Sequence, residues 1–206
     1  MKAIYIEGFV AIVIAGYVGL NYWQNHQRDI NSRVNYDGED VAISRPVKLS
    51  DTAYKICQTK RVADGDTIEV DCDGEELKLR FCGIDAPESK QPLGQESKAL
   101  MAKLVEGKQV MVYPIEKDRY DRTIAEVEVF SGQKTDKGEN VNLFVNGEMV
   151  LSGLAYHYAQ YSSSCPNKEA IVNAEDLAKD KKLGVWSGNY QKPWDYRKQL
   201  RSLSNG

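Results

Sequence analysis

The stretch Arg80-Phe81-Cys82-Gly83-Ile84-Asp85-Ala86-Pro87-Glu88 decides how the rest of the sequence is interpreted. Residues 77–81 alternate apolar and polar side chains, which is the pattern of a β-strand with one buried face. This strand runs into a tight turn that places Asp85 and Glu88 three residues apart, with Arg80 five residues before Asp85. Carboxylates attract metal ions and a guanidinium pairs with phosphate, so this strand end can bind both together.

A second acidic turn, Asp64-Gly65-Asp66-Thr67, lies just upstream. The chain between the two turns reads as a short hairpin, because Asp73-Gly74 is a strong turn dipeptide. A hairpin of this length lets Asp66 and Asp85 meet at one end of the strands. Taken alone, an Asp-Gly-Asp sequence is most often only a turn, and Asp64 fits a role in shaping that turn.

Alternation and turn signals predict an α+β domain. They indicate strands over residues 54–63, 67–72, 76–82, 110–113 and 123–130, a polar loop over 131–139, and helices over 95–105, 145–152 and 168–182. Glycines follow the helical segments, as expected at helix ends. Five strands followed mostly by helices predict a small β-barrel with helices packed on it.

The amino-terminal segment is predicted to lie outside this domain. Residues 8–20 are almost wholly apolar, and extending the segment back to residue 3 gives about the length that spans a membrane. We therefore expect a membrane anchor over residues 1–27, a polar tether over 28–52 and the domain over 53–206. The alternatives are a cleaved signal peptide, whose cleavage site would be poor here, and a buried core helix. Flanking charges give no clear orientation.

Composition limits the classes of function. The chain has 206 residues, 42% of them hydrophobic and 28% charged, which is a globular balance. The formal net charge of −3 argues against a protein that binds nucleic acid by phosphate neutralisation alone. It does not argue against an enzyme, because an enzyme needs only a few well-placed cations.

The order of the motifs resembles the staphylococcal nuclease-like (thermonuclease) family. The matching pieces are Asp64 to Thr67, Arg80 to Glu88, Asp118-Arg119-Tyr120-Asp121-Arg122, the segment around Gly153-Leu154-Ala155, and the tail Lys192 to Arg197. Each motif alone is weak, whereas the ordered set is specific. The resemblance implies a five-stranded OB-fold barrel with three helices, and calcium-dependent cleavage of DNA or RNA.

The resemblance also implies a set of site residues. Asp66, Asp85 and the carbonyl of Ala86 match metal ligands, which suit Ca²⁺ because it prefers oxygen. Glu88 matches the general base, and Arg80 and Arg122 match two arginines that bind the scissile phosphate.

Further matches concern the substrate. Arg119, Tyr120 and Tyr161 are the residues that the resemblance assigns to substrate binding. Tyr156 and Tyr158 can equally be packing residues. One departure is Asp121, which stands where the family usually has glycine, and its carboxylate could compete with phosphate for Arg122.

The four cysteines bear on the compartment. Cys57 and Cys72 lie at nearly equal distances from the Asp64-Gly65 turn, so a regular hairpin would place them opposite each other, close enough for a disulfide. A bulge would break that register. Cys82 and Cys165 remain as a second pair. The alternative is four reduced thiols in a cytosolic protein, but the even count and the apolar amino-terminal segment favour an oxidising compartment.

Together these observations predict a monomeric, membrane-anchored calcium-dependent endonuclease of low sequence preference. Its catalytic domain is expected to be periplasmic or extracellular, and the protein to be secreted if the first segment is cleaved. Two other classes remain open: an OB-fold that binds nucleic acid without cutting it, and a membrane-anchored interaction module.

Overall fold

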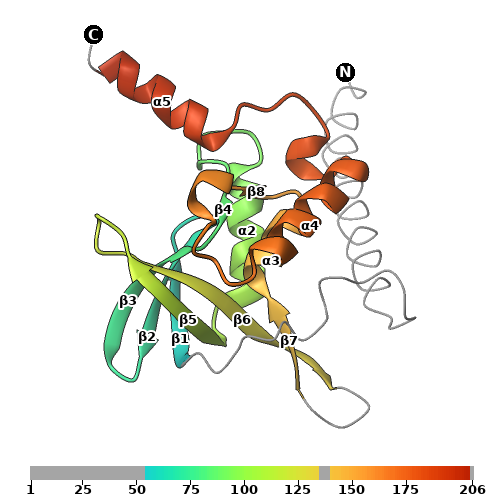
Figure 1. Cartoon of the computed structure of the whole chain (residues 1–206). Coiled ribbons are helices and arrows are strands. Elements are labelled where there is room, and N and C mark those ends of the chain that lie inside the picture. Colours follow the sequence, from blue (N-terminus) through green and yellow to red (C-terminus); the bar gives the residue numbers. More distant parts are fainter. Residues whose placement is uncertain (1–53, 135–139, 205–206) are drawn as a thin grey trace, which may run out of the picture. The chain divides into compact units, whose positions relative to one another are not determined.

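A six-stranded sheet forms the body of the domain (Figure 1). In this computed structural model, residues 54–134 and 140–204 are described, and all structural statements below concern them. The strands of this sheet are β1 (Lys55–Val62), β2 (Thr67–Cys72), β3 (Glu75–Phe81), β5 (Gln109–Lys117), β6 (Thr123–Lys134) and β7 (Asn140–Phe144).

Five of these strands close into a ring. The strand order is β3-β2-β1-β5-β6, and β6 then pairs with β3, so that Leu79 lies opposite Thr123 and Phe81 opposite Ala125. This closing pair is parallel, whereas every other pairing in the sheet is antiparallel. The predicted α+β class and its five strands are confirmed. The polar loop expected from residue 131 begins later, because β6 continues to Lys134 and pairs with β7.

Within residues 54–134 and 140–204, four α-helices accompany the ring, so the prediction of three was wrong. They are α2 (Gly94–Val105), α3 (Val145–Leu151), α4 (Lys168–Asp180) and α5 (Pro193–Ser204). The additional helix is α5, which follows the 3-10 turn η2 (Gly184–Trp186). Two short strands, β4 (Ile84–Asp85) and β8 (Tyr156–His157), pair with each other, and the 3-10 turn η1 (Ala159–Tyr161) follows β8.

The core fills the ring and the space beneath the helices. Strand residues of alternating burial contribute one side, and the helices contribute their apolar residues, among them Met101, Val105, Met149 and Ile171. Buried Asn146 of α3 accepts a hydrogen bond from the Val127 amide (3.0 Å) and donates one to the Cys82 carbonyl (3.0 Å). This side chain therefore fastens α3 to the end of β3, where the site begins.

Two disulfides are present, and their pairings are those expected, Cys57–Cys72 and Cys82–Cys165. The first joins β1 to β2. A register shift does occur in β1, between Thr59 and Arg61, but it lies on the turn side of the pair, so the strands stay in register beside the disulfide. The second joins the end of β3 to the loop before α4.

The predicted anchor (1–27) and tether (28–52) lie outside the described residues, so both remain predictions. Within the described ranges, no helix has the length and apolar character needed to cross a membrane.

Candidate active site

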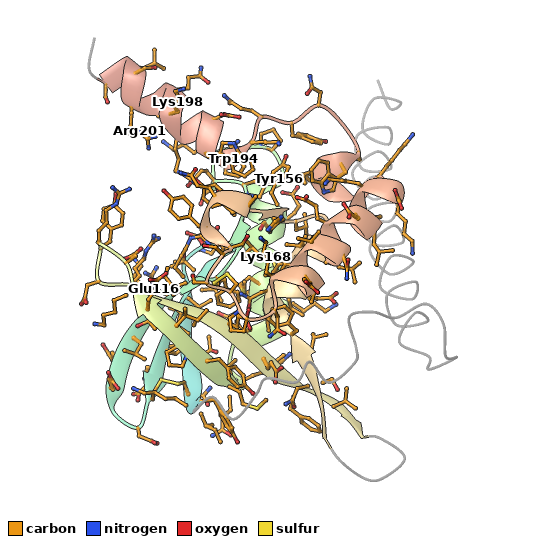
Figure 2. The ribbon with its side chains drawn as sticks, in the orientation of Figure 1. Glu116, Tyr156, Lys168, Trp194, Lys198 and Arg201 are labelled. Atoms are coloured by element: carbon orange, nitrogen blue, oxygen red, sulfur yellow. A yellow bond between two sulfur atoms is a disulfide. The ribbon has the colours of Figure 1, made fainter. Side chains whose placement is uncertain are left out.

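A pocket of about 490 Å³ opens where β2 and β3 meet the carboxyl-terminal helix. Side chains from three directions line it. We call Asp66, Arg80, Asp85, Ala86 and Glu88 the strand-end wall, and residues 118–122, between β5 and β6, the turn wall. The third side consists of residues from η1 and α5, and Figure 2 shows the side chains around them, with Trp194 and Arg201 labelled on α5.

The two acidic turns meet in the strand-end wall. The side chain of Asp66 accepts a hydrogen bond from the Ala86 amide (2.8 Å), and the Asp66 carbonyl accepts one from the Phe81 amide (2.9 Å). Asp64 orders its own turn, because its carboxylate accepts the amide of Asp66 (3.0 Å). These bonds fix the Asp66 carboxylate beside the turn that carries Asp85.

Arg80 joins the two carboxylates. Its Nη2 lies 2.8 Å from Asp85 Oδ1 and 3.1 Å from Asp66 Oδ2, while its Nη1 donates to the carbonyls of Phe81 (3.1 Å) and Ile84 (2.7 Å). The Arg80 side chain is 12% exposed and that of Asp85 is fully buried. One guanidinium is therefore committed to four oxygen atoms through its two terminal nitrogens.

Sequence reasoning missed Arg197, which reaches the same carboxylates from α5. Its Nη2 lies 2.7 Å from Asp85 Oδ2, and its Nη1 donates to Asp85 Oδ1 (3.1 Å) and Glu88 Oε1 (2.7 Å). The only available signal was the quoted tail motif, which gave no role to this arginine. Glu88 is further positioned by its amide, which donates to Gln91 Oε1 (2.9 Å).

The turn wall is organised by Asp118. One oxygen of its carboxylate accepts the amides of Tyr120 (2.9 Å) and Arg122 (3.0 Å), and the other contacts Arg122 Nε (2.8 Å) and Nη2 (2.7 Å). Asp121 has a left-handed backbone (φ 60°), which explains why glycine suits this position. Its carboxylate is 83% exposed and pairs with Lys117 (2.6 Å), so Asp118 rather than Asp121 is the acidic partner of Arg122.

Aromatic side chains surround the opening. Tyr120 is 68% exposed, and the guanidinium carbons of Arg119 and Arg122 lie 5.2 and 5.6 Å from its ring centroid. On the other side, Tyr161 is exposed and contacts Tyr158 edge-on (4.8 Å between centroids). The structure thus brings Arg119, Tyr120 and Tyr161 to the pocket, as predicted, while their roles remain predictions.

Tyr156 and Tyr158 differ in their surroundings. Tyr156 is buried and packs edge-on against Trp186 (5.2 Å) and Trp194 (5.7 Å), so it is a packing residue. Tyr158 lines the pocket and stacks on Trp194 with centroids 5.0 Å apart and planes 3° from parallel. This stack places the first turn of α5 beside the site.

Burial controls the acidity of the carboxylates. It raises the pKa of Asp85 above its usual value, and the hydrogen bonds from Arg197 offset only part of that effect. Burial, together with the negative charge of Asp66, raises the pKa of Asp64 to about 6. Burial therefore makes the charged forms of Asp85 and Asp64 less favourable, and nearby cations are needed to stabilise them.

The donor set of this wall fits a hard cation. Asp66 and Asp85 both lie within ion-pair distance of one nitrogen of Arg80, so their oxygens lie close together and already share one cationic group. Two carboxylates and a main-chain carbonyl are ligands that Ca²⁺ prefers. In the ranges that the structure describes, no group of three or more His, Cys, Asp or Glu side chains is arranged to hold a metal, so carbonyl and water oxygens would have to complete such a site.

Comparison with known proteins places this arrangement in context. The family model described as "Staphylococcal nuclease homologue" matches residues 78–188. The chain is 33% identical over 146 residues to "Micrococcal nuclease" of Shigella flexneri, covering 70% of this chain and 82% of that protein. It is 38% identical over 155 residues to an "Uncharacterized endonuclease" of Escherichia coli O157:H7, covering 75% and 90%.

Longer relatives match over a smaller share of their length. "Staphylococcal-like nuclease CAN1" of Arabidopsis thaliana is 34% identical over 128 residues, which is 62% of this chain but 35% of that protein.

Proposed function

Because the chain belongs to the staphylococcal nuclease homologue family, we propose that it is a calcium-dependent endonuclease. Its proposed reaction is hydrolysis of phosphodiester bonds in DNA or RNA with low sequence preference. The observation that carries the proposal is the convergence of Asp66 and Asp85 on Arg80, beside Glu88 and opposite Arg122, in one pocket. The order of strands in the closed ring supports an OB-fold, on which such sites can be built.

Asp66, Asp85 and the carbonyl of Ala86 are the proposed ligands of Ca²⁺. When bound, the ion would supply a Lewis acid that polarises a phosphoryl oxygen. The chain's own contribution is to hold the two carboxylates together: the Ala86 amide fixes Asp66, and Arg80 spans both.

Glu88 is the proposed general base. It would take a proton from the attacking water as the water oxygen bonds to phosphorus and the bond from phosphorus to the leaving oxygen breaks. The leaving oxygen takes a proton from solvent. Glu88 is suited to this role because its side chain is partly exposed (37%) and lines the pocket. Its bond to Arg197 limits the positions that its carboxylate can adopt.

The two proposed phosphate-binding arginines have different capacities. Both terminal nitrogens of Arg80 already contact oxygen atoms, so its Nε–H is the group left for a phosphate in this arrangement. Arg122 uses Nε and Nη2 for Asp118, which leaves its Nη1. Fixed cations on two sides of the phosphate would stabilise the charge that develops in the transition state.

The compartment is also a proposal. Two disulfides favour an oxidising location. We propose that the domain is extracytoplasmic, monomeric and anchored through residues 1–27. Titration of thiols in unreduced, unfolded protein from its native membrane should find none free. Four free thiols would contradict both the disulfides and the placement.

The deciding experiment measures nucleotide release from DNA and from RNA by the full chain, with Ca²⁺ and with excess chelator. Chelation and Asp66→Ala should each abolish release, because Asp85 alone cannot hold the ion. Asp176→Ala, which removes an exposed carboxylate of α4, should retain full activity. Full activity in chelator would refute the metal-dependent mechanism. Binding of nucleic acid without cleavage would favour the OB-fold binding protein. If the chain neither binds nor cleaves nucleic acid, the interaction module is favoured.

A further inference from the structure

The carboxyl-terminal helix α5 is attached to the pocket by its first turn. Pro193 is buried, Trp194 stacks on Tyr158, and Arg197 pairs with Asp85 and Glu88. Farther along, the side chains become exposed, and Figure 1 shows the later turns of α5 extending away from the other elements. The helix begins after residue 188, where the family match ends, so the match assigns it no role.

Arg201 lies one turn beyond Arg197 on the same side of α5. Residues four apart share a helix face and are about 6 Å apart along the axis. Both arginines line the pocket, whereas Lys198, which projects from another face, does not. Figure 2 labels Lys198 and Arg201 on this helix.

The pairing of charges distinguishes Arg201 from most pocket arginines. Arg80, Arg122 and Arg197 each have an aspartate partner within 3 Å. Among the described residues, no carboxylate lies within ion-pair distance of Arg201 or Arg119. A guanidinium at a pocket edge without an acidic partner is available to a phosphate.

The charge of the whole pocket supports the same conclusion. Five arginines and five carboxylates line it, so their formal charges cancel. The paired cations are committed near the strand-end and turn walls, whereas the uncommitted ones are Arg119 on the turn wall and Arg201 on α5. A polynucleotide lying in this pocket would meet both of these arginines as well as the proposed catalytic carboxylates.

We propose that α5 forms one wall of the polynucleotide groove and that Arg201 binds the phosphate of a nucleotide adjacent to the scissile one. This inference rests on the proposed nuclease function and adds a binding position outside the reacting centre. The attachment of α5 through Trp194 and Arg197 would hold Arg201 at a fixed distance from Asp85. A substrate with only one phosphodiester would not reach Arg201.

The test compares two substrates and two variants of the full chain in Ca²⁺. The substrates are a 12-nucleotide single-stranded DNA and a dinucleotide with one phosphodiester. For Arg201→Ala, the KM for the 12-mer should rise roughly three- to tenfold at low salt, with kcat and dinucleotide cleavage unchanged. Arg201→Glu should raise KM further. Lys198→Ala removes one charge from the same helix outside the pocket, and it should leave both substrates unaffected.

A binding measurement separates a phosphate contact from an indirect effect. In a Glu88→Gln background, the affinity for labelled 12-mer should fall less steeply with salt after Arg201→Ala, by about 0.7 in the log–log slope for one lost contact. Equal effects of Arg201→Ala and Lys198→Ala, or equal effects on both substrates, would overturn the inference while leaving the nuclease function intact. If the unaltered chain cleaves neither substrate, the proposed function fails and this inference fails with it.

Discussion

The two walls of the pocket use the same chemical pair, an aspartate and an arginine, in different surroundings. In the strand-end wall, Asp85 is fully buried between Arg80 and Arg197, and burial raises its pKa despite both arginines. In the turn wall, Asp118 is partly exposed. Burial also acts on it, but the hydrogen bonds from Arg122 outweigh that effect and hold its pKa below the usual value.

The difference shows what each wall is suited to do. A buried carboxylate that pairs with two arginines is held in one position and is costly to disturb, as expected of a ligand that must not move. An arginine on a turn has one acidic partner and a free edge, as expected of a group that meets an exchanging substrate. The five predictions below test this contrast.

The largest combined effect on stability and activity is expected from Asp85→Asn. The change leaves two guanidinium groups facing a neutral amide in a buried place, so the free energy of unfolding should fall by about 3–5 kcal/mol. Nuclease activity should fall at least a hundredfold, since a proposed metal ligand is lost. Denaturant unfolding and nucleotide release measure the two effects.

The matched change in the turn wall is Asp118→Asn. The side chain is only partly buried, and an amide oxygen can still accept the Tyr120 and Arg122 amides, so the loss of stability should stay below about 1 kcal/mol. Equal losses in the two variants would contradict the proposed difference between the walls.

Removal of the disulfide beside the site, Cys82–Cys165, is expected to give the next largest effect. Cys82–Cys165 spans 83 residues and ties the end of β3 to the loop that follows Tyr161, whereas Cys57–Cys72 spans 15 and lies within the barrel. Loop closure predicts a loss of about 4–5 kcal/mol for Cys82→Ser with Cys165→Ser, and about 3 kcal/mol for the other pair. Activity at a temperature where both variants are folded should fall only when the site disulfide is absent. A similar loss of activity in both variants would show that the disulfide has no specific effect on the pocket.

The next effect in order of size is expected from replacing the two arginines that are proposed to bind the phosphate. Arg80→Ala and Arg122→Ala should each lower turnover about a hundredfold, since each removes a preorganised charge near the phosphate. Only Arg80→Ala should also reduce the free energy of unfolding, by several kcal/mol, because it leaves the buried Asp66 without a cationic partner and Asp85 with Arg197 alone. Measuring thermal unfolding and single-turnover cleavage on the same variants separates the effect on stability from the effect on turnover. A change in turnover of less than about threefold for Arg122→Ala would remove that residue from the site.

The sequence predicted the part of the site that depends on local pattern. Alternation located the strands, and turn chemistry placed Asp66 and Asp85 at one strand end. It did not predict α5, which buries only Pro193 and leaves its later apolar residues, Leu200 and Leu203, exposed. Pro193 at the first helical position, followed by Asp195 in the first turn, was the signal that could have located it.

Arg197 could not be located by pattern. It lies 112 residues from Asp85, and tertiary contacts such as the stacking of Trp194 on Tyr158 bring the two together. For Asp121, in contrast, the sequence suggested a contact that the structure does not contain. The motif raised the possibility that its carboxylate competes for Arg122, but the left-handed turn directs it to Lys117, which local sequence does not reveal.

The smallest effect is expected from Asp121→Gly, which restores the usual family residue in the turn wall. Glycine adopts the left-handed backbone without steric cost, whereas aspartate tolerates it, so stability should rise by about 1 kcal/mol or less. Turnover should change less than about twofold, because the Asp121 carboxylate is exposed and contacts Lys117 rather than Arg122. Asp121→Asn is the control, since it removes the charge and keeps a side chain that accepts this backbone. A rise in turnover of more than about threefold in both variants would show that the carboxylate does compete with phosphate, and the turn wall would then be a weakened site rather than an intact one.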